Sequence, residues 1–99
     1  MQMAAEVESS EDGLRRARQL LQNGRFGDAA TICRDILDRE ADHRDALYTL
    51  AVAQRFAKDA SAALVTLGQL IALTPSYGRA WQERGHCLRD LGQIGRAHV

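Results

Sequence analysis

The residues best suited to metal binding or covalent chemistry are three histidines and two cysteines, which lie far apart in the sequence. They are His43, His86, His98, Cys33 and Cys87. None of their intervals matches the short spacings of a zinc site. His86 and Cys87 are neighbours, but adjacent side chains on a helix point about 100° apart and do not readily share one ion. We therefore predict no metal site and interpret both cysteines as reduced packing residues, because free thiols are commonly buried.

Phosphate binding and nucleophilic catalysis lack support in the sequence. The stretch Gly24-Arg25-Phe26-Gly27 has two glycines but lacks the Gly-rich pattern and the Lys-Ser/Thr pair of a phosphate-binding loop. No serine, threonine or cysteine has a neighbouring base that would activate it as a nucleophile. We predict no catalytic residue and no cofactor.

The charge balance of the chain is neutral, with 13 basic and 13 acidic residues. It has no polybasic segment, so we expect neither nucleic-acid nor membrane-surface binding. No run approaches about 18 consecutive apolar residues, and residues 1–10 lack the apolar centre of a secretory signal. On these grounds we expect a cytoplasmic protein without a transmembrane span.

Helix-forming residues dominate the chain, and apolar residues recur at helical spacing in five stretches. The predicted helices cover residues 11–23, 27–39, 44–56, 59–73 and 78–91. Gly92 is expected to end the fifth helix, because glycine accepts the backbone geometry of a helix end. The predicted N-terminal capping residues are Ser9, Ser10 and Asp12 for the first helix, Asp42 for the third and Asp59 for the fourth.

A period of 34 residues relates these helices, and it is clearest at small side chains that would sit where paired helices cross. A small residue there lets two antiparallel backbones approach closely. Such a period of helical pairs is typical of the tetratricopeptide repeat. The repeated positions are Ala17, Ala51 and Gly85, then Ala29 and Ala63, then Cys33 with Leu67 and Ile36 with Leu70.

The chain resembles the tetratricopeptide repeat family over about residues 10–92. The resemblance implies an all-α fold, a right-handed superhelical array of antiparallel helix pairs with about two and a half repeats and five helices. Stacking of neighbouring pairs would supply the core, since one pair cannot bury its apolar face alone. The best-matching residues, all in the second unit, are Leu47, Leu50, Ala51, Ala63, Leu67, Leu70 and Pro75.

The predicted organisation is a flexible head at 1–9, repeat 1 at 10–43, repeat 2 at 44–77 and the first helix of a truncated repeat 3 at 78–93. Residues 94–99 match a translated sequencing-library adapter, so we expect this tail to be non-native and the chain to be a fragment of a longer array. The alternative is that Ala97 continues the period from Ala63. In the fifth helix, the residues expected to face inward are Trp81, Gly85, Leu88 and Leu91. Without a sixth helix, Trp81, Cys87, Leu88 and Leu91 would be exposed.

The resemblance further implies a concave groove lined by the first helix of each pair. On the predicted helices this stripe carries four arginines and two carboxylates, so we expect a mildly basic groove in which Arg55 is solvent-exposed. It would bind a protein or peptide segment, acidic or C-terminal, through charge-assisted hydrogen bonds. The alternative is a solvated helix face. The candidate groove residues are Arg18, Asp45, Tyr48, Arg55, Arg79, Gln82, His86 and Arg89.

Some members of this family hold the C-terminal carboxylate of chaperones in a clamp of Lys, Asn and Arg side chains. The corresponding positions here carry Leu14, Arg18, Thr49, Arg79 and Glu83. Only Arg79 has the required character, so chaperone-tail binding is disfavoured. Two hypotheses remain beside the peptide-binding scaffold. The repeats could form the non-catalytic N-terminal region of a larger enzyme, such as a bacterial sulfotransferase, or the chain could self-associate through the exposed C-terminal helix.

Overall fold

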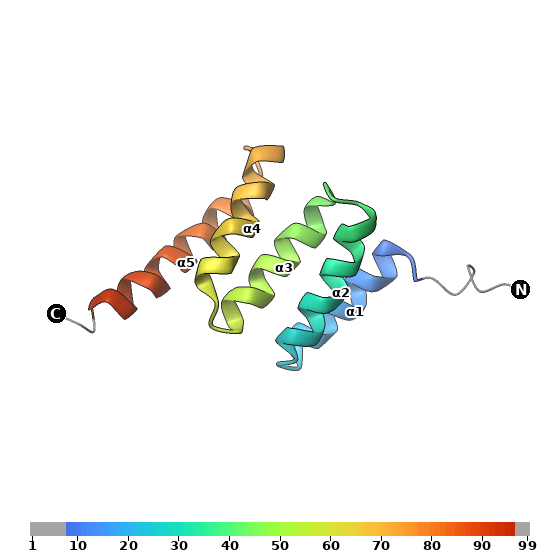
Figure 1. The fold of residues 1–99 in the computed structure, drawn as a ribbon, viewed down its shortest axis with the longest axis horizontal. Helices are drawn as coiled ribbons and strands as arrows, with labels where there is room; N and C mark the ends of the chain where they lie inside the picture. The colour runs from blue at the N-terminus through green and yellow to red at the C-terminus, as the bar shows by residue number, and fades with distance from the viewer. Residues whose placement is uncertain (1–7, 97–99) are drawn as a thin grey trace, which may run out of the picture.

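Five α-helices make up the computed structural model, which describes residues 8–96 and their side chains as far as residue 92. The chain advances from α1 at one end of the molecule to α5 at the other (Figure 1). No strand occurs in this part of the chain, so the predicted all-α, five-helix fold is confirmed. The bounds are α1 Ser10–Gln22, α2 Phe26–Arg39, α3 Arg44–Phe56, α4 Ala60–Leu73 and α5 Gly78–Arg96.

The first four helices lie within one residue of their predicted bounds, but α5 is longer than predicted. Gly92 does not end it, and the helix continues to Arg96. A glycine inside a helix costs only about 1 kcal/mol, and no proline follows that would force a break. The expected turn into a sixth helix is therefore absent from the described residues. Half of the suspected tail, residues 94–96, continues α5, while residues 97–99 lie outside the described part.

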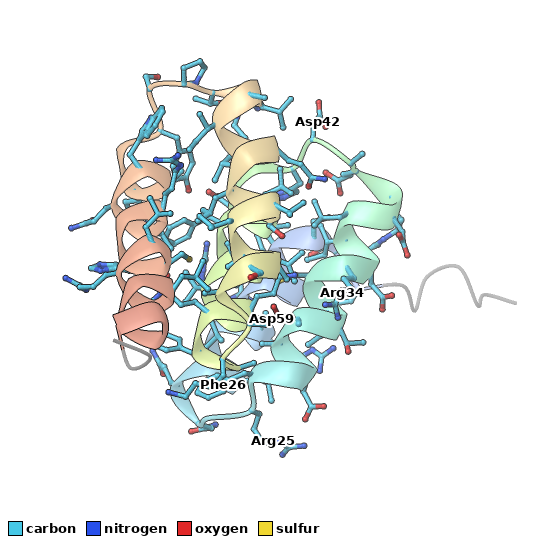
Figure 2. All side chains as sticks on the ribbon, turned by 60° about the vertical axis from the view of Figure 1, so that its left-hand side comes forward. Arg25, Phe26, Arg34, Asp42 and Asp59 are labelled. Atoms are coloured by element: carbon cyan, nitrogen blue, oxygen red, sulfur yellow. The ribbon has the colours of Figure 1, made fainter. Side chains whose placement is uncertain are left out.

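Helix starts follow the sequence predictions in two of the three predicted cases. The Ser9 hydroxyl accepts the backbone N–H of Asp12 at 3.1 Å, and the Asp59 carboxylate accepts that of Ala62 at 3.1 Å. For α3 the prediction was wrong, because His43 Nδ1 accepts the Ala46 N–H at 3.2 Å. Asp42 lies one residue too early, in the α2–α3 turn (Figure 2).

The core forms where small residues let paired helices cross. Ala17 of α1, Ala29 of α2, Ala51 of α3 and Ala63 of α4 are all fully buried, as their 34-residue spacing predicts. Around Ala51 and Ala63 lie larger apolar residues from α3, α4 and α5. α3 also contacts both α1 and α5, so the first helix of each pair lies beside its counterpart. The hairpins therefore stack into one continuous array.

The packing face of α5 differs from the prediction. Its buried residues are Ala80, Glu83 and Cys87, which turn toward α3 and α4. Trp81 and Leu88 are 48% and 45% exposed, and Gly85 also faces solvent. No helix within residues 8–96 packs on that side of α5, so the inward assignment of these three residues was wrong, whereas the exposure of Trp81 and Leu88 expected without a sixth helix is confirmed. Leu91 is half-buried.

Both cysteines are free and buried, as predicted, although Cys87 was expected at the exposed face. Burial raises the pKa of the Cys33 thiol to about 12, against a smaller opposing effect of Arg18 and Arg34. Burial also raises the pKa of Cys87. Since the thiolate is the reactive form, both side chains act as packing residues.

Candidate functional site

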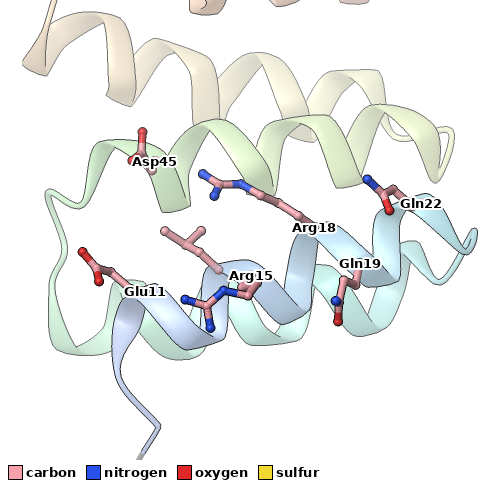
Figure 3. Close-up of a pocket in the computed structure, with 7 residues that line it drawn as sticks. Glu11, Arg15, Arg18, Gln19, Gln22 and Asp45 are labelled. Atoms are coloured by element: carbon pink, nitrogen blue, oxygen red, sulfur yellow. The ribbon is translucent and has the colours of Figure 1, made fainter.

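An open pocket of about 550 Å³ lies between α1 and the start of α3. Arg18 extends across this space, with its guanidinium on the side of Asp45, and Glu11 lies nearby (Figure 3). The pocket floor includes Leu14, which is 4% exposed. The structure thus places two of the predicted groove residues, Arg18 and Asp45, around one pocket. Its complete lining is Glu11, Leu14, Arg15, Arg18, Gln19, Gln22 and Asp45.

A cluster of two tyrosines and one arginine adjoins this pocket between α3 and α5. The rings of Tyr48 and Tyr77 have centroids 5.9 Å apart. The Arg79 guanidinium lies 4.7 Å from the centroid of the Tyr48 ring and 5.5 Å from that of Tyr77. Such cation–π contacts hold an arginine in a defined orientation. Tyr48 and Arg79, both predicted as groove residues, therefore form one cluster with Tyr77.

Hydrogen bonds through the Tyr77 hydroxyl connect the cluster to the pocket. The hydroxyl donates to Asp45 Oδ1 at 3.1 Å and accepts from Arg79 Nη2 at 3.0 Å. Burial raises the pKa of Tyr77, and the bond to Asp45 raises it further, while Arg79 opposes both effects. The phenol accordingly stays protonated and can donate to the carboxylate. Asp45 is the shared member of pocket and cluster.

Arg55 is not the solvent-exposed groove residue expected from the sequence. Its side chain is only 18% exposed, and its Nε donates to a carboxylate oxygen of Glu83, whose side chain is 7% exposed. A second carboxylate, that of Asp90, lies 3.7 Å from its Nη1. Burial lowers the pKa of Arg55, but the bond to Glu83 and the two negative charges outweigh it, so the net shift is upward. The ion pair between Arg55 and Glu83 therefore joins α3 to α5 and has a structural role.

The remaining predicted residues lie on α5. His86 is half-buried, with its Nδ1 2.6 Å from Arg89 Nη2. Gln82 is exposed and makes no side-chain hydrogen bond to any described residue. The structure thus joins Arg18, Asp45, Tyr48 and Arg79 around the pocket and its cluster, whereas Gln82, His86 and Arg89 stand apart on α5.

Two residues that make these contacts, Tyr77 and Glu83, were not predicted as site residues from the sequence. Tyr77 precedes α5 in a turn and so lies on no helical stripe. Glu83 lies between Ala80 and Cys87 at helical spacing. A carboxylate on an apolar helix face signals a buried charge that needs a partner, and this signal could have identified the pair with Arg55.

Two negative findings concern only the described residues. No group of three or more His, Cys, Asp or Glu side chains among them is placed to hold a metal ion. No helix in residues 8–96 combines the length and apolar character needed to cross a membrane.

A family model described as the tetratricopeptide repeat matches residues 20–83. A search of curated proteins finds no match to the chain. The matched region includes most of the stacked hairpins and more than half of the chain, so this protein belongs to the tetratricopeptide repeat family. Members of this family are typically non-catalytic scaffolds for protein–protein interaction, and the stacked array described above supports an interaction role in general.

Proposed function

We propose that this domain binds an extended acidic segment of another protein along the surface formed by α1, α3 and α5. The observation that carries the proposal is the network around Asp45. It joins the open pocket beside Arg18 to the cluster of Tyr48, Tyr77 and Arg79. A ligand lying along these three helices would contact both parts at once.

Two arginines of this surface are available to carboxylates in the ligand, although Glu11 and Asp45 also line the pocket. Among the described residues, Arg18 and Arg79 form no ion pair within 4 Å, whereas Arg15 pairs with Asp12 and Arg55 with Glu83. An arginine held by aromatic rings loses little conformational freedom when it binds a carboxylate in a bidentate manner. The tyrosine faces would add apolar contact area at low entropic cost.

The proposal can be tested with a fluorescein-labelled ten-residue peptide of alternating Glu and Ala, and a Lys–Ala peptide of the same length as control. Fluorescence anisotropy should show binding of the acidic peptide only, weakening as salt rises. Arg18→Glu and Arg79→Gln should each weaken binding by roughly tenfold. The matched control is Arg34→Glu on the exposed side of α2 (Figure 2), which should leave binding unchanged. Salt-insensitive binding, or equal loss in all three variants, would refute the proposed groove.

The hypothesis that these repeats belong to a larger enzyme stays a prediction, as does self-association through α5. The peptide-binding role requires neither of them.

A further inference from the structure

An open apolar groove of about 640 Å³ lies between the C-terminal ends of α2 and α4. Leu47 of α3 is 2% exposed and forms its floor, while Leu73 at the end of α4 is 41% exposed. The groove shares no lining residue with the pocket beside Arg18. Its complete lining is Leu37, Ala41, Asp42, Leu47, Gln69, Ala72 and Leu73.

This α2–α4 groove lies at the junction of two complete hairpins, and the repeat supplies a counterpart for comparison. A groove of about 350 Å³ beside α2 is lined by residues at the same repeat positions, but most of them are charged. The fold therefore accepts charged side chains here, and the apolar lining is a property of the α2–α4 groove alone. The residues Leu47, Gln69, Ala72 and Leu73 of the α2–α4 groove correspond to Gly13, Asp35, Asp38 and Arg39 of its counterpart.

The apolar positions of α4 are exposed whatever follows them in the array. α2 is followed by a complete hairpin, yet its residues at these positions are exposed too. α4 differs because it has no charged residue from Ala60 to Leu73. Exposed apolar surface beside an apolar groove is typical of an interaction site. The exposed residues of α2 are Thr31, Asp38 and Arg39, at the positions of Val65, Ala72 and Leu73 of α4.

We propose that the α2–α4 groove binds a segment of a partner protein that carries a bulky apolar side chain next to a lysine or arginine. The apolar side chain would pack against Leu37, Leu47 and Leu73. The cation would pair with Asp42, which lies in the α2–α3 turn at one end of the groove (Figure 2).

Asp42 determines the charge of the segment that fits. Among the described residues that line the groove, it is the only charged one. Its carboxylate forms no ion pair within 4 Å and accepts no hydrogen bond from a described residue, since His43 caps α3 in its place. Arg34, one turn before Leu37 on α2, does not line the groove. A carboxylate beside an apolar groove attracts a cation and disfavours an acidic segment.

Fluorescence anisotropy with three fluorescein-labelled ten-residue peptides tests the proposal. The first alternates Leu and Lys, the second Ala and Lys, and the third Leu and Glu. The Leu–Lys peptide should bind at least about tenfold more tightly than either of the others. Equal binding of the Ala–Lys peptide would refute the apolar contact, and equal binding of the Leu–Glu peptide would refute the role of Asp42.

Variants of the groove locate the binding. The Ala72→Asp/Leu73→Arg double variant introduces the residue types that α2 carries at the same positions, so it should fold and should weaken Leu–Lys binding at least about tenfold. Asp42→Lys should reverse the preference between the Leu–Lys and Leu–Glu peptides. The matched control is Asp35→Lys, an exposed carboxylate of α2 outside the groove, which should leave the preference unchanged.

Two further outcomes would overturn the proposal. Leu–Lys binding that survives Ala72→Asp/Leu73→Arg, or that Arg18→Glu abolishes, would mean that the peptide binds elsewhere. A peptide-free dimer that sedimentation detects, and that Ala72→Asp/Leu73→Arg dissociates, would mean that a second copy of the chain occupies the groove.

Discussion

α3 and α5 have the same place in the repeat but opposite environments. Leu47 and Trp81 lie 34 residues apart, yet Leu47 is 2% exposed and Trp81 is 48% exposed. Ala51 is fully buried, whereas Gly85, its counterpart, faces solvent. The difference arises because α4 covers α3, and no described helix covers the same face of α5. In a repeat array, burial at a given position is therefore decided by the neighbouring helix and not by the side chain alone.

The largest expected difference in the free energy of unfolding is between the alanine variants of Leu47 and Trp81. Leu47→Ala removes a side chain buried between α3 and α4 and should lower the free energy of unfolding by about 2–5 kcal/mol. Trp81→Ala should cost only about 1 kcal/mol, since half of its surface is already in water. Urea unfolding followed by circular dichroism measures both. Equal losses would mean that the α5 face is covered in solution.

Overpacking tests the helix crossing itself. Ala63 is fully buried opposite α3, so Ala63→Leu should cost about 1–3 kcal/mol. Ala72→Leu on the exposed side of the same helix is the matched control and should change stability by less than about 0.5 kcal/mol. A thermal melt of Ala63→Leu that matched the control would contradict the crossing at Ala51 and Ala63.

Helix positions and the buried crossing residues could be predicted from the sequence because they depend on local signals and on a repeated pattern. Helical periodicity fixed the bounds of α1 to α4, and the 34-residue period identified Ala17, Ala29, Ala51 and Ala63. Both signals are present in every complete hairpin. The end of α5 was misjudged, because a glycine ends a helix reliably only where tertiary structure requires a turn.

The candidate site was predicted only in part, because side-chain partners depend on packing between helices. Arg18 and Asp45, predicted on neighbouring first helices, both line the pocket. Arg55 was assigned to the groove because its charge suggested exposure. In the structure it is partly buried, because it pairs with Glu83 and lies near Asp90 of α5. Tyr77 joins the cluster from a turn, which no helical periodicity describes.

Removal of Glu83 tests the ion pair that joins α3 to α5. Glu83→Ala leaves the Arg55 guanidinium partly buried with only Asp90, 3.7 Å away. We expect a loss of about 1–2 kcal/mol, because an under-compensated charge stays in a poorly solvated place. Asp28→Ala, which removes an exposed pair with Arg25, should cost less than about 0.5 kcal/mol. Equal chemical denaturation midpoints for the two variants would show that water solvates the Arg55 guanidinium once Glu83 is removed.

The smallest expected effect on stability differs between two glycines that lie one helical turn apart in the repeat. A Cβ built on Gly85 meets nothing within 4 Å, so Gly85→Ala should stabilise the protein by about 0.5–1 kcal/mol through reduced backbone entropy of the unfolded chain. Gly13→Ala should gain less or lose stability, because its Cβ would lie 3.2 Å from Ile36 Cδ1 under α2. Thermal melts at several protein concentrations measure both changes. Destabilisation by Gly85→Ala that grew with protein concentration would mean that a second chain already packs against α5, and α3 and α5 would then no longer differ in environment.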